Sequence, residues 1–153
     1  MPEHQPPAAS AFPPPPGFVL PVRIYYEDTD AGGVVYYANY LRFCERARSE
    51  WLRALGFEQR HLLKDGGPIF VVRRVQADYL SPARLDDSLT VVNTIGELRH
   101  ASVCFLQRIF RNDALLFAAK IKIACVSTSQ GRPAPWPAAL RDRFRAQIPS
   151  PSA

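Results

Sequence analysis

The sequence predicts an α+β fold in which a curved, five-stranded antiparallel sheet wraps around one long helix. Its 153 residues are enough for a single domain with a sizeable core. One segment carries the apolar repeat of an amphipathic helix, a short strand-like run precedes it, and four alternating segments follow it. Because one helix can cover that many strands only if the sheet curves around it, the pattern predicts the wrapped arrangement.

The first two predicted elements are a short strand and the long helix. Residues 22–26 are rich in β-branched and aromatic side chains, which favours a strand. The helix is predicted over residues 38–55, where apolar residues recur every three or four positions and charged residues occupy the other face. Gly56 is typical of a residue that ends a helix. The apolar stripe consists of Tyr40, Leu41, Cys44, Ala47, Trp51, Leu52 and Leu55.

Four strands are predicted after the helix, because the apolar period changes there to two residues. The last of them has an unbroken apolar face, while Lys120 and Lys122 alternate onto the other face. Such alternation is typical of an antiparallel sheet buried on one side, whose exposed edges favour association with another chain. The four predicted strands cover residues 69–79, 89–97, 101–111 and 115–127.

The positions of the prolines predict the domain boundaries. The chain contains 15 prolines, about twice the usual share. Eight lie in residues 1–21 and five lie from Pro133 onward, so the middle of the chain is nearly free of them. We therefore expect a disordered N-terminal tail over residues 1–21 and a folded segment over residues 22–132, which a second proline-rich end follows.

Charge and cysteine content narrow the class of protein. The net charge is +5, but residues 22–130 hold 15 basic and 12 acidic residues, with no basic run interleaved with aromatics. This disfavours nucleic acid as a partner and still allows a small phosphorylated ligand. The widely spaced Cys44, Cys104 and Cys125 form no CxxC motif, which disfavours a disulfide framework or a metal site and predicts a cytoplasmic protein. No signal peptide and no transmembrane segment is predicted.

The segment at residues 25–40 has the residue types that acyl transfer to water requires. Glu27, Asp28 and Asp30 precede two glycines and the start of the predicted helix. The unpaired amides of a first helical turn can hold a developing oxyanion, and a carboxylate beside them can attack a carbonyl or activate water. The alternative is structural: the acids form a turn or cap the helix, and the glycines allow a positive φ.

The same segment resembles a known family. It reads DAGGVVY at residues 30–36, followed by Tyr40, Glu45 and RAR at residues 46–48. This is similar to the 4-hydroxybenzoyl-CoA thioesterase family of hotdog-fold proteins, and most of all to its YbgC-type acyl-CoA thioesterases. The resemblance covers residues 22–140, so we expect the folded domain to extend to residue 140 and a C-terminal tail to follow over residues 141–153. It implies a helix wrapped by an antiparallel sheet. Further similar stretches are FVV at residues 70–72, DY at 78–79, PARLDD at 82–87, QRI at 107–109 and GRPAPWP at 131–137.

The resemblance implies roles for five residues. It puts the catalytic carboxylate at Asp30, as nucleophile or as general base, and the backbone amide that polarises the thioester carbonyl at Tyr37. Gly33 and Val34 fall at the substrate, and Arg132 is the first candidate for the phosphates of coenzyme A. YbgC-type members usually carry His where this chain has Tyr37, and the hydroxybenzoyl-CoA branch carries Tyr. A backbone role is compatible with either residue.

Other residues with chemical potential are expected to be mainly structural. Asp28 is a second turn acid, and three further basic residues are weaker candidates for phosphate contacts. The histidines have no partner at metal-ligand spacing, and the cysteines fall on the apolar helix stripe or in strands, where packing is their expected role. The basic residues are Arg84, Lys120 and Lys122, and the histidines are His4, His61 and His100.

The resulting expectation is an acyl-CoA thioesterase acting on a short-chain aliphatic or aromatic acyl group, without a metal or cofactor. The resemblance also implies a homodimer or homotetramer with sites between protomers, and it leaves acyl carrier protein open as a partner. One rival is a hotdog dehydratase, but that class uses a site histidine and none lies between Ile24 and Arg60. Another rival is a non-catalytic acyl-binding or scaffold protein. A thioesterase acting on acyl carrier protein is the third.

Overall fold

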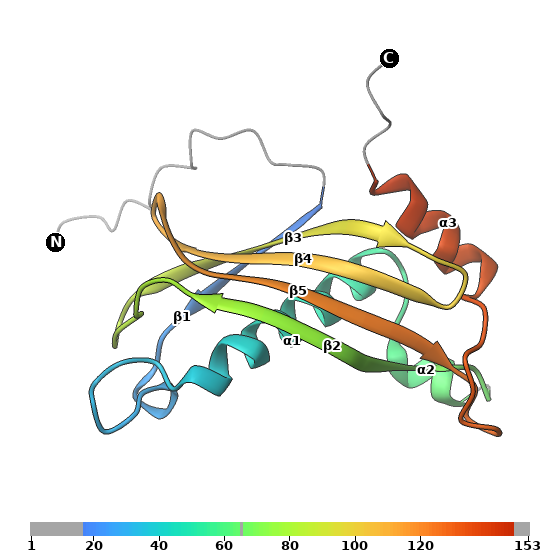
Figure 1. Ribbon diagram of the computed structural model, residues 1–153, viewed down its shortest axis with the longest axis horizontal. Coiled ribbons are helices and arrows are strands. Elements are labelled where there is room, and N and C mark those ends of the chain that lie inside the picture. Colours follow the sequence, from blue (N-terminus) through green and yellow to red (C-terminus); the bar gives the residue numbers. More distant parts are fainter. Residues whose placement is uncertain (1–16, 65, 149–153) are drawn as a thin grey trace, which may run out of the picture.

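The structure is a computed structural model that describes residues 17–64 and 66–148. It contains a five-stranded antiparallel sheet in the order β1-β3-β4-β5-β2, and the long helix α1 lies across one face of it (Figure 1). The predicted fold class is confirmed. The strands are β1 (Phe18–Arg23), β2 (Ile69–Tyr79), β3 (Ser88–Leu98), β4 (Ser102–Arg111) and β5 (Ala114–Val126); the helices are α1 (Tyr37–Ala54), α2 (Gln59–Lys64), α3 (Ala138–Ala146) and the short 3-10 helix η1 (Tyr26–Asp28).

Helix α1 ends where Gly56 predicts. The N–H of Phe57 donates to the carbonyl of Leu52 at 2.9 Å and the N–H of Gly56 donates to that of Arg53 at 3.0 Å. This is a Schellman motif, and Gly56 takes the positive φ of 95° that it requires. The buried face carries most of the predicted stripe together with Phe43 and two polar residues: it consists of Asn39, Tyr40, Phe43, Cys44, Ala47, Arg48, Trp51 and Leu52.

The inner face of the sheet packs against α1. In β5, Phe117 and Ile121 are buried on that face, whereas Lys120 is exposed on the other, as the alternation predicts. Two polar residues also lie on the inner side: Asn93 of β3 and Gln107 of β4 are fully buried and hydrogen-bonded to each other. The helix–sheet interface is therefore apolar with a polar group at its middle.

The first strand begins earlier than predicted. Residues 18–21 were expected in the disordered tail, but they belong to β1, where Phe18 pairs with Asn93 of β3. Pro21 does not prevent this, because an edge strand tolerates a residue that lacks an outward N–H. The predicted strand end at residues 24–26 is also wrong, since the chain turns into η1 there. Residues 1–16 of the expected tail lie outside the described part.

The predicted C-terminal tail over residues 141–153 is likewise wrong in its first part. Helix α3 runs through residue 146 and buries Leu140 and Phe144. Trp136, just before it, is buried and packs on Phe70 and Phe144 with ring centroids 5.2 and 5.3 Å away. The i, i+4 spacing of Leu140 and Phe144 was the signal for this helix, and the surrounding prolines and arginines obscured it. Residues 149–153 lie outside the described part.

Within the described residues, no helix has the length and apolar character needed to cross a membrane.

Candidate active site at the start of the long helix

Asp28 ties the acidic segment to the first turn of α1. Its carboxylate accepts a hydrogen bond from the N–H of Tyr25 at 2.8 Å. Its carbonyl accepts two more, from the N–H of Tyr36 at 2.9 Å and from the side-chain amide of Asn39 at 3.0 Å. Asp28 and Asn39 are both buried. Asp28 therefore has a structural position, and Asn39 is a positioning residue that the periodicity of the sequence did not single out.

Asp30 is held in the turn that follows. Its backbone N–H donates to the carbonyl of Val34 at 2.8 Å, and its carbonyl accepts from the N–H of Gly33 at 3.0 Å. Its Oδ1 accepts from the N–H of Gly32 at 2.8 Å. Gly33 sits at a φ of 80°, with open space where a Cβ would project. Among the described residues no hydrogen bond uses Oδ2, so the exposed carboxylate both shapes the turn and keeps one oxygen free for chemistry.

The first turn of α1 offers unpaired backbone donors. No hydrogen bond between described residues uses the N–H of Tyr37 or of Ala38, because a helix has no preceding turn to supply an acceptor. These amides lie at the positive end of the helix dipole. They are the kind of donor that can hold an oxyanion.

Aromatic side chains surround a hollow of about 250 Å³ beside this turn, lined in part by Tyr37, Tyr40 and Tyr79. The hydroxyl of Tyr79 donates to the carbonyl of Tyr37 at 2.9 Å, which links β2 to the start of the helix. Burial and then the neighbouring phenols raise the pKa of Tyr79. Phe117 closes the base of this cluster, with ring centroids 5.2 Å from Tyr40 and 5.0 Å from Tyr79. Sequence reasoning missed Tyr79 because only the folded sheet brings it to the helix.

The connection between β2 and β3 supports the turn from the other side. The N–H of Val35 donates to the carbonyl of Ala83 at 2.9 Å, and Val34 forms an isolated β-bridge with Arg84. Asp87 holds this connection by accepting from the N–H of Arg84 and from the guanidinium of Arg111, both at 2.8 Å. Of the basic residues predicted to contact phosphates, Arg84 is therefore the one that lies beside Val34 within the same protomer.

The remaining basic candidates lie elsewhere in the protomer. Arg132 follows the far end of β5, where Pro133 forms a bridge with Val126. Val126 is nine residues along the strand from Phe117, which is about 30 Å. Figure 1 shows this loop and the loop before α1 at opposite ends of the sheet. Lys120 and Lys122 are on the outer face of β5, away from α1.

The histidines and cysteines stand apart from the turn at Asp30. His61 on α2 and His100 between β3 and β4 are exposed, and His4 lies outside the described residues. All three cysteines are free. Burial raises the pKa of the Cys44 thiol to about 12 and that of Cys125 to about 11, and it also raises the pKa of Cys104. High thiol pKa values disfavour a nucleophilic role.

Comparison with known proteins identifies the family of this chain. Residues 32–118 match the model of the thioesterase superfamily, and the chain belongs to this superfamily. Acyl-CoA thioesterase YbgC of Haemophilus influenzae is 47% identical over 128 residues, which cover 84% of this chain and 94% of that protein. Acyl-CoA thioesterase YbgC of Helicobacter pylori is 39% identical over 133 residues, which cover 81% of this chain and 97% of that protein.

A solved structure supports the fold. The crystal structure of Slr0204, a 1,4-dihydroxy-2-naphthoyl-CoA thioesterase from Synechocystis, matches with a TM-score of 0.79 at 25% identity, over 84% of this chain and 95% of that chain. The resemblance noted from residues 25–48, the hotdog fold and the classification as a thioesterase are therefore confirmed.

We expect Asn39→Ala to lower the free energy of unfolding by about 1–3 kcal/mol, because it leaves the buried carbonyl of Asp28 without one of its donors. Urea denaturation would measure the loss. Arg42→Ala, at an exposed position of the same helix, is the matched control and should change stability little. Equal stability of the two variants would contradict the positioning role of Asn39.

The Asp87 carboxylate should make stability depend on acid pH. Burial alone would raise its pKa, but the hydrogen bonds and charges of Arg84 and Arg111 outweigh burial and lower the pKa. The ionised form therefore stabilises the fold above the pKa of the unfolded chain, and this contribution disappears as the pH falls through the folded value. We expect wild type to be more stable than Asp87→Asn at pH 7, and this difference to shrink as the pH falls below the usual pKa of an aspartate. Urea denaturation at a series of pH values would measure both variants, and a difference that does not change with acid pH would contradict this.

Proposed function

We propose that this protein hydrolyses acyl-CoA thioesters with a short-chain aliphatic or aromatic acyl group. The observation that carries the proposal is the exposed Asp30 carboxylate, held in a turn directly ahead of a helix whose first amides have no acceptor among the described residues. The names of the Haemophilus influenzae and Helicobacter pylori relatives support acyl-CoA as the thioester. The aromatic hollow beside Tyr37 suits a small acyl group.

In the proposed reaction, the N–H of Tyr37 donates to the thioester carbonyl oxygen and stabilises the charge that develops on it. By the general-base route, Asp30 takes a proton from water as the water oxygen adds to the carbonyl carbon. The C–S bond then breaks, and the departing thiolate takes up a proton, so that free acid and coenzyme A result. By the nucleophilic route, Asp30 itself adds to the carbon, the thiolate leaves, and water hydrolyses the mixed anhydride. Neither route needs a metal or a cofactor.

The protein is further proposed to act as a homodimer, or as a tetramer of two such pairs. Strand β2 is at an edge of the sheet, yet it exposes Val71, Val72 and Val75. An unpaired edge with apolar side chains is a surface that a second strand can cover. Two β2 strands pairing about a two-fold axis would be antiparallel, so that the Ile69 end of one meets the Tyr79 end of the other.

This pairing would bring a second basic residue to the start of α1. Arg132 lies near the Ile69 end of β2, because Val126 pairs with Ile69 and bridges to Pro133. Tyr79, at the other end, is hydrogen-bonded to Tyr37. Arg132 of a second copy would therefore approach the helix start and join Arg84 there as a contact for the phosphates of coenzyme A. The three free cysteines support a reducing, cytoplasmic setting.

Purified wild type should release thiol from at least one of a panel of aliphatic and aromatic acyl-CoAs and acyl carrier protein thioesters. Asp30→Asn should lower kcat by a factor of about 100 or more, because the amide keeps an oxygen for the N–H of Gly32 but can neither accept the proton nor attack. Glu27→Gln, a neighbouring exposed acid, is the matched control and should keep full activity.

Each outcome of this assay has a distinct meaning. If wild type hydrolyses no thioester, the enzymatic proposal fails and a non-catalytic acyl-binding protein becomes the better reading. If it hydrolyses only carrier-protein thioesters, coenzyme A is the wrong carrier. If Asp30→Asn retains full activity, the assignment of Asp30 fails while the function stands.

Val75→Lys should convert the proposed dimer to monomers and lower turnover, because it puts an extra positive charge in the middle of the β2 edge. Val19→Lys makes the same change on the opposite edge strand, β1, where Val19 is similarly exposed, and should leave assembly intact. Light scattering during size-exclusion chromatography would measure the mass of both. A monomeric wild type with full activity would contradict the proposal.

A further inference from the structure

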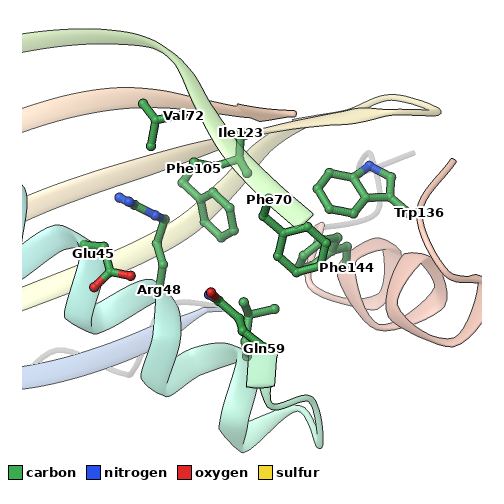
Figure 2. A pocket seen from close by; sticks show the side chains of 10 residues that line it. Glu45, Arg48, Gln59, Phe70, Val72, Phe105, Ile123, Trp136 and Phe144 are labelled. Carbon is green, nitrogen blue, oxygen red and sulfur yellow. The ribbon is translucent and has the colours of Figure 1, made fainter. Parts of the chain in front are cut away.

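A second pocket lies along the later half of α1, between that helix, β2 and α3 (Figure 2). Its volume is about 200 Å³, and its walls are mainly apolar, with Phe70, Phe105, Trp136 and Phe144 among the lining residues. Arg48, its charged residue on the inner side of α1, is 11 residues beyond Tyr37, about 16 Å along the helix axis. Within one protomer this pocket is therefore separate from the turn at Asp30, whereas in the proposed dimer its Phe70 and Val72 would lie toward the Tyr79 end of the second copy.

Arg48 is rigidly held at the edge of this pocket. Arg48 is only 8% exposed, and its Nη1 donates to Oε1 of Gln107 at 2.8 Å. The Gln107 amide group donates in turn to the carbonyl of Cys44 at 2.9 Å and to the side-chain oxygen of Asn93. Gln107 and Asn93 are fully buried. Because each partner is itself fixed, the guanidinium has one orientation, in which Figure 2 shows it among the pocket-lining side chains, between α1 and Val72.

No carboxylate of the described residues forms an ion pair with the guanidinium of Arg48. Its hydrogen-bond partner Gln107 is neutral. Glu45 also borders the pocket, but it is exposed and its carboxylate accepts from the hydroxyl of Ser49. Burial lowers the pKa of Arg48, and the nearby charge of Glu45 offsets only part of this effect. A buried cation in this condition is stabilised by any anion that reaches it.

The guanidinium and the aromatic walls of the pocket together favour one kind of anion. A guanidinium binds a carboxylate through two parallel hydrogen bonds, and the aromatic walls suit an apolar body attached to it. A phosphate is less suited, because its several charges would lie against apolar walls and near Glu45. We infer that this pocket binds a small carboxylate with an apolar carbon skeleton, with Arg48 as the group that receives the carboxylate.

Two sources would supply such a ligand. One is a free carboxylic acid, which is the class of product that thioester hydrolysis releases. The other is a terminal carboxylate on the acyl chain of a thioester. Binding of the free acid stands without the proposed activity, whereas the thioester source rests on the proposed function.

Isothermal titration calorimetry of the full chain tests the site directly. The probes are benzoate and hexanoate, with benzamide and hexanamide as uncharged counterparts of the same shape. We expect wild type to bind at least one acid, and to bind it more tightly than its amide. Arg48→Met should weaken this binding by about tenfold or more, because it removes the charged hydrogen bonds, and Arg48→Lys should restore part of it. Arg53→Met, at an exposed position on the same helix, should bind as wild type does.

A second variant keeps the test valid if Arg48→Met does not fold. Gln59→Trp introduces a large side chain at an exposed position that borders the pocket and leaves Arg48 untouched. It should weaken binding of the same acid. The inference is overturned if folded wild type binds neither acid, if acid and amide bind equally, or if the Arg48→Met or Gln59→Trp variant, once folded, binds the acid like wild type.

Kinetics then separate the two sources. If the ligand is a terminal carboxylate, Arg48→Met should lower kcat/KM for glutaryl-CoA by about tenfold more than for pentanoyl-CoA. If the ligand is the free acid, the ratio between these substrates stays as in wild type, and the inhibition constant of added hexanoate or benzoate rises. If no thioester is hydrolysed at all, the proposed function fails, and the calorimetric result still decides whether the pocket binds carboxylates.

Discussion

The fold depends on one constraint: a single long helix has to cover the inner face of a five-stranded sheet. The centre of the sheet meets this requirement, because Phe117 and Ile121 pack beneath α1. The ends need additional cover. At one end Trp136 and Phe144 fill the space with the help of α3, and at the other end the aromatic cluster around Tyr79 does so. The exposed valines of the edge strand β2 lie in the part of the sheet that the helix does not cover.

Both candidate sites arise where polar residues enter this interface. At the start of α1, Asn39 binds the carbonyl of Asp28 and so sets the position of the turn that carries Asp30. Further along α1, Arg48 binds Gln107 at the edge of a mainly apolar pocket. Burying a polar group costs free energy unless it is hydrogen-bonded. Asn39 is paired with a backbone carbonyl within the fold, whereas the charge of Arg48 is paired only with the neutral side chain of Gln107.

Much of this could be predicted from periodicity and local chemistry. The 3.6-residue repeat identified α1, Gly56 identified its end, and the two-residue repeat identified the four later strands within a residue or two. The start of the first strand was missed because prolines suggested a disordered tail where an edge strand tolerates one. Helix α3 was missed because the prolines before it obscured its short apolar repeat. Arg132 was assigned to the phosphates of coenzyme A from the family resemblance alone, and within one protomer the length of β5 lies between it and Asp30.

The sequence by itself determined the fold class, the family and the segment that carries the carboxylate, because these follow from local periodicity and from a contiguous motif at residues 30–36. The tertiary structure alone decided which distant residues meet. It brought Tyr79 to the carbonyl of Tyr37 and Gln107 to the guanidinium of Arg48, across 42 and 59 residues of chain. Such pairs depend on which strands become neighbours and on how the helix lies across them, and these long-range pairings are absent from the local pattern of a single sequence.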